Sequence, residues 1–338
     1  MVEVCAANLA HSCFLVVTPV LPVQVAPVFI GREGWSHSIP EAARPMLHEL
    51  QIRIAGISAR AWTVQPLVRL HCPEPDSRFL VDEAPADLDI EVQVGDLPDT
   101  GSAPLLFQGR EVWSLVGDDR SLYLRYGNAR EGIEFDRVLH LLPDRTGLLT
   151  VLPDPDLPPE APQTIAPFAF PGLEVLLYRE AAVRGGVFFH GSGLEFEGSG
   201  CLFCGLSGAG KSTISGLLRD AGARILNDDR VGMMPGPTGP VLHGTPWHGT
   251  ARYHTPDSVP LGAIFFIEHG DRNRLSRLGQ IEASARLVAA GCPPYYSSEL
   301  MQRAVAACED AAARVPAYRL AFVPEPSVVD VVREAVVS

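Results

Sequence analysis

The stretch "CLFCGLSGAGKSTIS", residues 201–215, decides the fold that this sequence predicts. Its centre, from Gly205 to Ser212, matches the pattern G-x-x-x-x-G-K-[ST] at every position. An apolar, strand-like run precedes the pattern and a helix-like run follows it, which is the context the pattern requires. The glycines let the backbone curl so that its N–H groups point at phosphate oxygens, and the helix N-terminus adds partial positive charge. The stretch therefore predicts a phosphate-binding loop in an α/β domain.

We expect ATP to be held by the loop residues Gly205, Ser207, Gly208, Ala209, Gly210, Lys211, Ser212 and Thr213. Lys211 reaches the β- and γ-phosphates in such loops, and the Ser212 hydroxyl is a ligand for Mg²⁺. Lys211 is also the only lysine among 27 basic residues, the other 26 being arginines. Coding bias accounts for the arginines, whereas a broad guanidinium at position 211 would crowd the backbone cradle. The alternative is a glycine-rich turn that binds nothing.

Asp228 and Asp229 end the next predicted strand, 17 and 18 residues after Lys211. Carboxylates at the end of a strand beside a phosphate loop face the crevice where ligands bind. One can hold Mg²⁺ and the other can accept a proton from an attacking hydroxyl. The alternative is a solvated turn in which Arg230 pairs with one of them.

Histidines lie on both sides of these aspartates in the sequence. His190 ends the apolar run "VFFH", before a turn predicted at residues 190–193. A single histidine is more often a hydrogen-bonded structural residue than a ligand. The stretch "HGTPWHGTARYH", residues 243–254, has a spacing that fits no helix-borne metal site, and it predicts a functional loop.

The composition predicts a globular protein of two domains. A chain of 338 residues with 46% hydrophobic content is longer than a single hydrophobic core usually supports. A net charge of −13 argues against nucleic acid or an anionic membrane as a partner. Seven scattered cysteines indicate reduced thiols in the cytoplasm. Cys201 and Cys204 form a C-x-x-C that we interpret as part of a buried strand rather than a metal or redox site. The apolar, proline-interrupted segment between Glu3 and Arg32 predicts edge strands rather than a signal peptide or a membrane helix.

Three regions follow along the chain. Residues 1–152 are predicted to form a β-rich domain with alternating runs at 88–94, 110–116 and 120–127, and Asp118–Asp119 is interpreted as a hairpin turn. Residues 153–168 contain six prolines and predict an extended linker. Residues 169–338 alternate strands and helices, which predicts an α/β domain.

The order of "HG", "GLSGAGKST" and "DD" resembles the catalytic domain of HPr serine kinase/phosphorylase. The stretches "GTPWHG", "PLGAIFFIEHG" and "VPAYRLAFVPEPSVVDVV" are similar to HPr-kinase-like proteins, including those associated with lasso-peptide biosynthesis. The likeness covers about residues 170–338. It implies a fold related to phosphoenolpyruvate carboxykinase, with Mg-ATP as the phosphoryl donor.

Carried over to this chain, the resemblance implies Asp228 as general base, Ser212 and Asp229 as metal ligands, and His190 near the reacting phosphate. The "ExRGxGI" signature of the phosphorylase activity is absent, so dephosphorylation and HPr as substrate are not expected. A serine of a peptide or small protein is then the expected acceptor, captured by the β-rich domain through strand addition.

Two other functions stay open from the sequence. A kinase of a small hydroxylated metabolite would use His248 or Arg252 to clamp a substrate carboxylate. A non-catalytic ATP sensor would bind the nucleotide and be recognised by a partner. A homo-oligomer is compatible with either function.

Overall fold

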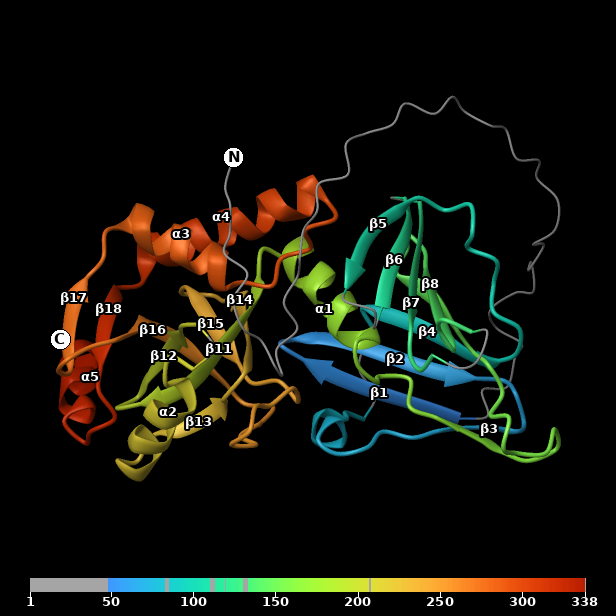
Figure 1. Ribbon diagram of the computed structural model, residues 1–338, viewed down its shortest axis with the longest axis horizontal. Coiled ribbons are helices and arrows are strands. Elements are labelled where there is room, and N and C mark those ends of the chain that lie inside the picture. Colours follow the sequence, from blue (N-terminus) through green and yellow to red (C-terminus); the bar gives the residue numbers. More distant parts are fainter. Residues whose placement is uncertain are drawn as a thin grey trace.

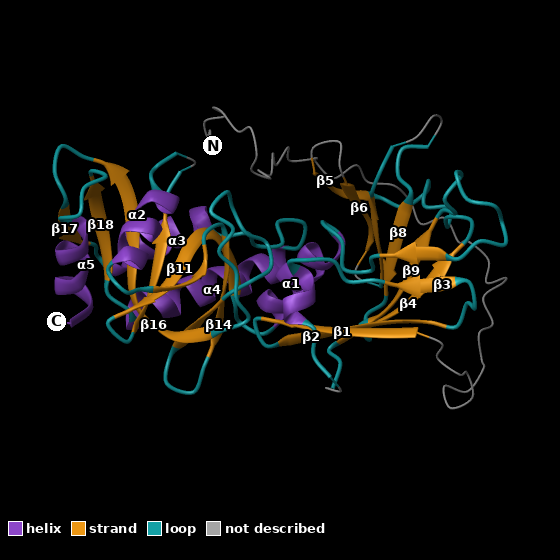
Figure 2. Ribbon diagram, turned by 90° about the horizontal axis from the view of Figure 1, so that it is seen from below, coloured by secondary structure: helices purple, strands orange, loops and turns teal. Residues whose placement is uncertain are grey.

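The computed structural model describes residues 48–82, 85–109, 113–118, 120–129, 133–206 and 208–337. The edge strands predicted between Glu3 and Arg32 lie outside these residues. The chain forms two lobes side by side, with helix α1 (Gly172–Val183) between them (Figures 1 and 2). Among the described residues, no helix has the length and apolar character that crossing a membrane requires.

The N-terminal lobe is one mixed sheet of eight strands, as the β-rich prediction for this region requires. In spatial order they are β1 (His48–Ile54), β2 (Ile57–Thr63), β4 (Leu88–Val94), β9 (Thr146–Val151), β8 (Arg137–Leu141), β7 (Ser121–Tyr126), β6 (Trp113–Asp118) and β5 (Leu105–Gly109). In β4, Leu88, Ile90 and Val92 are buried and alternate with more exposed residues, which is the period of a half-buried strand. Strand β5 lies at one edge of this sheet.

The predicted linker packs against the N-terminal lobe. Within it, β10 (Gln163–Ile165) pairs in parallel with β3 (Val68–Leu70), and Phe168 is buried in the core of this lobe. A short helical turn spans Asp76–Phe79. Asp118 occupies the hairpin turn that the sequence predicts and accepts hydrogen bonds from the N–H groups of Arg120 and Ser121, while Asp119 lies outside the described residues.

The C-terminal lobe is an α/β unit around a second sheet. Its strands are β11 (Val187–Phe196), β12 (Ser199–Cys204), β13 (Arg224–Asn227), β14 (Arg230–Pro235), β15 (Pro240–His243), β16 (Ser258–His269), β17 (Arg274–Arg277) and β18 (Ala317–Phe322). β16 pairs in parallel with both β12 and β18, whereas β11, β14 and β15 pair in antiparallel order. β11 and β16 are long strands, and each pairs with β12 as well as with a strand of the antiparallel group β14–β15. Because β12 pairs with both β11 and β16, the sheet closes on itself.

The turn predicted at residues 190–193 is wrong, because β11 runs through them without interruption. A Cβ at Gly191 would lie 2.8 Å from the Phe203 carbonyl oxygen, and one at Gly193 would lie 2.7 Å from a Val231 methyl carbon. These glycines allow neighbouring strands to approach closely. Close approach is, besides a turn, a second reason for glycine at such positions.

Helices cover both faces of the C-terminal sheet (Figure 1). Helices α2 (Lys211–Asp220) and α5 (Val328–Val337) share one core cluster, and α3 (Gln280–Ala290) and α4 (Ser298–Arg314) belong to another on the opposite face. Helix α1 instead belongs to the core of the N-terminal lobe, which it joins to Phe188 of β11. The predicted α/β class is therefore confirmed, while the relation to the HPr kinase fold stays a prediction.

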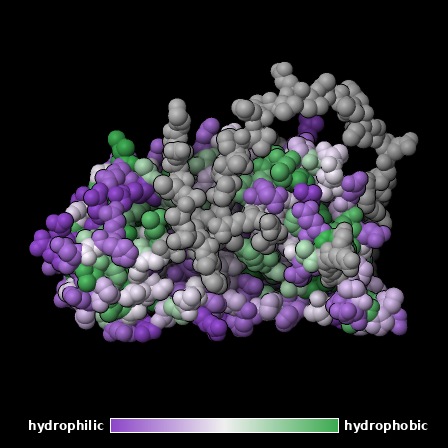
Figure 3. Space-filling view, viewed as in Figure 1, coloured by the Kyte–Doolittle hydropathy of each residue, from purple (hydrophilic) through white to green (hydrophobic). Residues whose placement is uncertain are grey.

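The surface differs between the lobes. On the face drawn in Figure 3, hydrophilic residues predominate at the end formed by the C-terminal lobe, and a hydrophobic patch lies on the N-terminal lobe with hydrophilic residues around it. Large apolar side chains that are exposed include Leu105 of β5 and Phe170, which precedes α1.

Candidate functional site

The glycine loop lies between β12 and α2, in the strand–loop–helix arrangement that its sequence predicts. Gly208 and Gly210 have φ angles of +82° and +103°, which residues with a Cβ rarely adopt. A Cβ at Gly210 would also lie 2.5 Å from the ring of Phe322. Ala209 is buried, Ser212 and Thr213 are exposed in the first turn of α2, and Ser207 lies outside the described residues.

Lys211 is the first residue of α2, and it is only 8% exposed. Its Nζ donates hydrogen bonds to the carbonyl oxygens of Gly205, at 2.9 Å, and Leu206, at 3.3 Å. Burial lowers the pKa of this ammonium below its ordinary value. The cation is therefore held at the start of the loop by weak, neutral acceptors, which a phosphate can replace.

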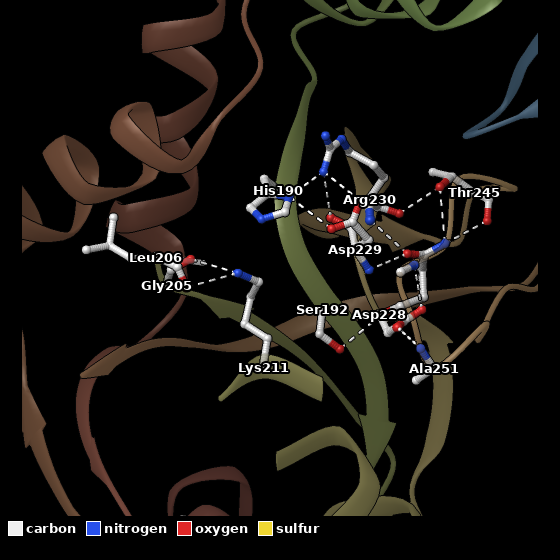
Figure 4. A network of polar contacts seen from close by, with 12 residues as sticks. His190, Ser192, Gly205, Leu206, Lys211, Asp228, Asp229, Arg230, Thr245 and Ala251 are labelled. Atoms are coloured by element: carbon white, nitrogen blue, oxygen red, sulfur yellow. Dashed lines mark hydrogen bonds and ion pairs between the residues drawn. The ribbon is translucent and has the colours of Figure 1, made fainter. Parts of the chain in front are cut away.

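Across from Lys211, the side chains of Asp229 and Arg230 meet His190 (Figure 4). His190 Nδ1 lies 3.1 Å from Asp229 Oδ1 and also contacts Arg230 Nη1. Arg230 Nη1 donates to Asp229 Oδ2 at 2.8 Å. The sheet brings these groups together because His190 and Arg230 are direct cross-strand partners on β11 and β14.

The charges in this cluster influence one another. Burial lowers the pKa of His190, and the positive charges of Arg230 and Lys211 act in the same direction. Burial alone would raise the pKa of Asp229, but the hydrogen bond with His190 and the charge of Arg230 outweigh it and keep that pKa below its ordinary value. A neutral imidazole beside an ionised carboxylate is the arrangement that prepares a histidine to accept a proton.

Asn227 determines the shape of the turn that carries both aspartates. Its Oδ1 accepts hydrogen bonds of 2.7 Å from the N–H groups of Asp229 and Arg230, and its Nδ2 donates to the Thr245 carbonyl at 2.8 Å. Asn227 is completely buried at the end of β13. Sequence reasoning missed this residue, although an asparagine at the end of a strand is a known turn former.

Asp228 points away from the cluster and is 2% exposed. Its Oδ1 accepts hydrogen bonds from the N–H groups of Gly249, at 3.0 Å, and Tyr253, at 3.2 Å, and its Oδ2 accepts one from Ala251 at 3.0 Å. A Cβ at position 249 would lie 2.7 Å from Asp228 Oδ2, so glycine allows this loop to come close. Asp228 thus holds residues 249–253 against the end of β13.

The predicted substrate residues lie on or beside this loop. His248 Nδ1 contacts the Gly249 carbonyl oxygen at 2.9 Å, and its ring stacks on His254 with centroids 5.1 Å apart. Arg252 is exposed and has a φ of +59°, and its carbonyl oxygen contacts His254 Nδ1. The described contacts do not connect either residue directly with Lys211 or His190.

A cleft of about 520 Å³ opens beside the loop. Its walls come from the glycine loop, the end of β16, the end of α3 and the segment that follows α3, and they include His190, Gly205, Leu206, Glu268, Arg286 and Tyr295. Arg286 and Glu268 form an ion pair of 2.6 Å within this wall. The volume lies in the usual range for a site that encloses a small ligand.

The residues near the loop fit Mg²⁺ held in the manner of nucleotide-dependent enzymes. Mg²⁺ keeps several waters and takes one or two protein oxygens together with substrate phosphates. The exposed Ser212 hydroxyl and the partly exposed Asp229 carboxylate are oxygen donors of this kind. Within the described ranges, no group of three or more His, Cys, Asp or Glu residues gathers as a metal site. Burial raises the pKa of both Cys201 and Cys204 to about 12.

Comparison with known proteins adds no family assignment. No protein-family model matches this chain, and no curated protein matches it significantly.

Proposed function

We propose that this protein is an ATP- and Mg²⁺-dependent kinase that transfers the γ-phosphate to a serine hydroxyl of a peptide or small protein. One observation carries the proposal: Gly205, Leu206 and Ala209 of the glycine loop line the same cleft as His190, and the buried Lys211 follows this loop. The resemblance of residues 170–338 to HPr-kinase-like proteins supports the same reaction class.

In this proposal the loop binds the phosphates of ATP through its N–H groups, and Lys211 exchanges the carbonyls of Gly205 and Leu206 for phosphate oxygens. Mg²⁺, held by Ser212 and Asp229 with the phosphates, would neutralise charge on the transferred group. Phosphoryl transfer needs little covalent chemistry from the protein, so positioning and charge supply most of the rate.

The proton of the attacking hydroxyl has two candidate acceptors. The resemblance to HPr-kinase-like proteins implies Asp228, and the contacts of the site favour His190 supported by Asp229. Asp228 is buried and its oxygens already accept three backbone hydrogen bonds, whereas His190 lines the cleft. As the hydroxyl oxygen bonds to the γ-phosphorus, the bond from that phosphorus to the bridging oxygen breaks, ADP leaves, and the proton passes to His190.

A peptide is the acceptor that the N-terminal lobe favours. Strand β5 ends its sheet among the described strands, and Leu105 on it is 51% exposed. An edge strand with an apolar side chain can add an extended peptide as a further strand. In the metabolite alternative, His248 or Arg252 would bind a substrate carboxylate.

The test is an ADP-release assay with ATP, Mg²⁺ and two acceptor panels. One panel contains serine-bearing peptides and the other contains free hydroxy-amino acids, and mass spectrometry identifies the phosphorylated product. Transfer to peptides that is absent in Lys211→Ala supports the proposal. Transfer only to free metabolites favours the alternative kinase, and tight ATP binding without ADP formation on any acceptor favours the ATP sensor.

A further inference from the structure

A buried row of charges extends from the candidate site into helix α1. Arg230 lies in the middle of this row and its side chain is 7% exposed. On one side its Nη1 donates to Asp229 Oδ2 and contacts His190 Nδ1. On the other side its Nε lies 3.4 Å from Glu174 Oε1, in the first turn of α1. The Glu174 side chain is also 7% exposed, so both members of this pair are shielded from water.

Glu174 is itself held in place by Tyr178, one turn later on α1. The Tyr178 hydroxyl donates to Glu174 Oε1. The Tyr178 ring packs against Phe188, with centroids 5.3 Å apart, and against the edge of Trp247 at 6.4 Å. Phe188 stands two residues before His190 on β11, and Trp247 leads into the loop that Asp228 holds. The carboxylate of Glu174 is therefore fixed relative to both halves of the site.

Helix α1 belongs to the core of the N-terminal lobe. Leu173, Leu176 and Leu177 are buried in the same cluster as the residues of the N-terminal sheet. Glu174 projects from this helix toward a residue of β14 in the C-terminal lobe. The position of Arg230 thus depends on a group that the N-terminal lobe supplies.

We propose that Glu174 is a positioning residue: it fixes the Arg230 guanidinium so that Asp229 and His190 adopt one orientation, and it thereby ties the site to the N-terminal lobe. A guanidinium is planar, so a carboxylate at each end defines its plane, whereas one alone leaves it free to rotate. The expected effect of Glu174 on the reaction rate rests on the proposed kinase function, whereas its expected effect on the orientation of His190 does not.

The test compares Glu174→Gln with Glu180→Gln. Glu180 is a matched control because it lies on the same helix, is completely buried and pairs with Arg179 at 2.7 Å and Arg145 at 3.2 Å, rather than with Arg230. Both substitutions remove one buried negative charge, so both are expected to lower the free energy of unfolding. Only Glu174→Gln is expected to alter the site.

The first readout is a comparison of the crystal structures of wild type, Glu174→Gln and Glu180→Gln. In wild type, Arg230 Nη1 donates to Asp229 Oδ2 at 2.8 Å, and His190 Nδ1 lies 3.1 Å from Asp229 Oδ1. Without the Glu174 carboxylate the Arg230 guanidinium can rotate, so at least one of these two contacts is expected to lengthen beyond about 3.5 Å in Glu174→Gln.

The second readout is the kinetics of phosphate transfer. Glu174→Gln is expected to lower kcat about 10- to 100-fold, the effect of misplacing reacting groups by a fraction of an ångström to an ångström, and to leave the KM for ATP within about twofold. Glu174→Asp keeps the charge and should restore part of kcat. Glu180→Gln should leave both the contacts of Asp229 and kcat as in wild type.

The proposal is overturned if Glu174→Gln leaves both contacts of Asp229 at their wild-type distances, or if Glu180→Gln lengthens them equally. If Glu174→Gln does not fold, the structures of Glu174→Asp and Glu180→Asp take its place: longer contacts in Glu174→Asp alone support the proposal, and no difference overturns it. If wild type phosphorylates no acceptor, the kinase function fails, and the structures still decide the role of Glu174.

Discussion

The contacts of Asp228 lead to a prediction that separates a structural role from a catalytic one. In Asp228→Asn, one of the two carboxylate oxygens becomes an NH₂ group. That oxygen position accepts an N–H from Ala251, or from Gly249 and Tyr253, depending on the orientation of the amide. In either orientation at least one of these N–H groups loses its acceptor and faces another donor.

The magnitude follows from these three hydrogen bonds. A hydrogen bond to a charged group contributes about 1.5–3 kcal/mol, and a neutral one about 0.5–1.5 kcal/mol. Losing one bond outright and weakening the rest should therefore lower the free energy of unfolding by at least about 2 kcal/mol. If Asp228 were instead the general base, its main loss would be a factor of about 10² to 10⁴ in kcat.

Urea unfolding followed by circular dichroism measures the first quantity, and the ADP-release assay measures the second. His190→Gln serves as the comparison, with the opposite result expected: a large loss of kcat and a small change in unfolding. The reasoning is refuted if Asp228→Asn unfolds within about 0.5 kcal/mol of wild type while its kcat falls by 10² or more. The base role predicted from the sequence would then stand.

Three further predictions concern the loop and the imidazole. Lys211→Ala should weaken ATP binding by at least about tenfold in calorimetry, and Lys211→Arg should not restore it, because a guanidinium does not fit the backbone cradle; full restoration would contradict this account. Gly210→Ala should lower the free energy of unfolding by at least about 1 kcal/mol, because its φ is positive and its methyl group would meet Phe322. The matched change Gly216→Ala, where nothing lies within 4 Å of the added carbon, should raise it by about 0.5–1 kcal/mol; equal effects at both glycines would argue against the strained loop. The pKa of His190 is lowered from 6.5, so kcat/KM should be constant from neutral pH downward and fall only below 6.5 as the imidazole becomes protonated; a profile that His190→Gln leaves unchanged would exclude His190 as the base.

Much of the C-terminal lobe could be predicted because its signals are local. The glycine loop between β12 and α2 follows from the residues at its own positions, since only glycine adopts the left-handed backbone at 208 and 210 without strain. In the N-terminal lobe, alternating apolar residues likewise predicted β4 at the bounds observed, because a half-buried strand has a period of two. The turn predicted at 190–193 failed because glycine has two uses, and only the neighbouring strands reveal which one applies.

A phosphate-type loop, two aspartates and a histidine, in an α/β domain behind a β-rich lobe, could be recognised from the amino-acid sequence alone. What each carboxylate does depends on tertiary contacts. Asp228 and Asp229 are adjacent in the chain, yet one accepts the N–H groups of a loop some 20 residues away and the other meets His190 on a neighbouring strand. The partnership of Glu174 with Arg230 likewise joins two lobes. Such contacts depend on the packing of distant segments, because no local propensity places a carboxylate beside a guanidinium 56 residues later in the chain.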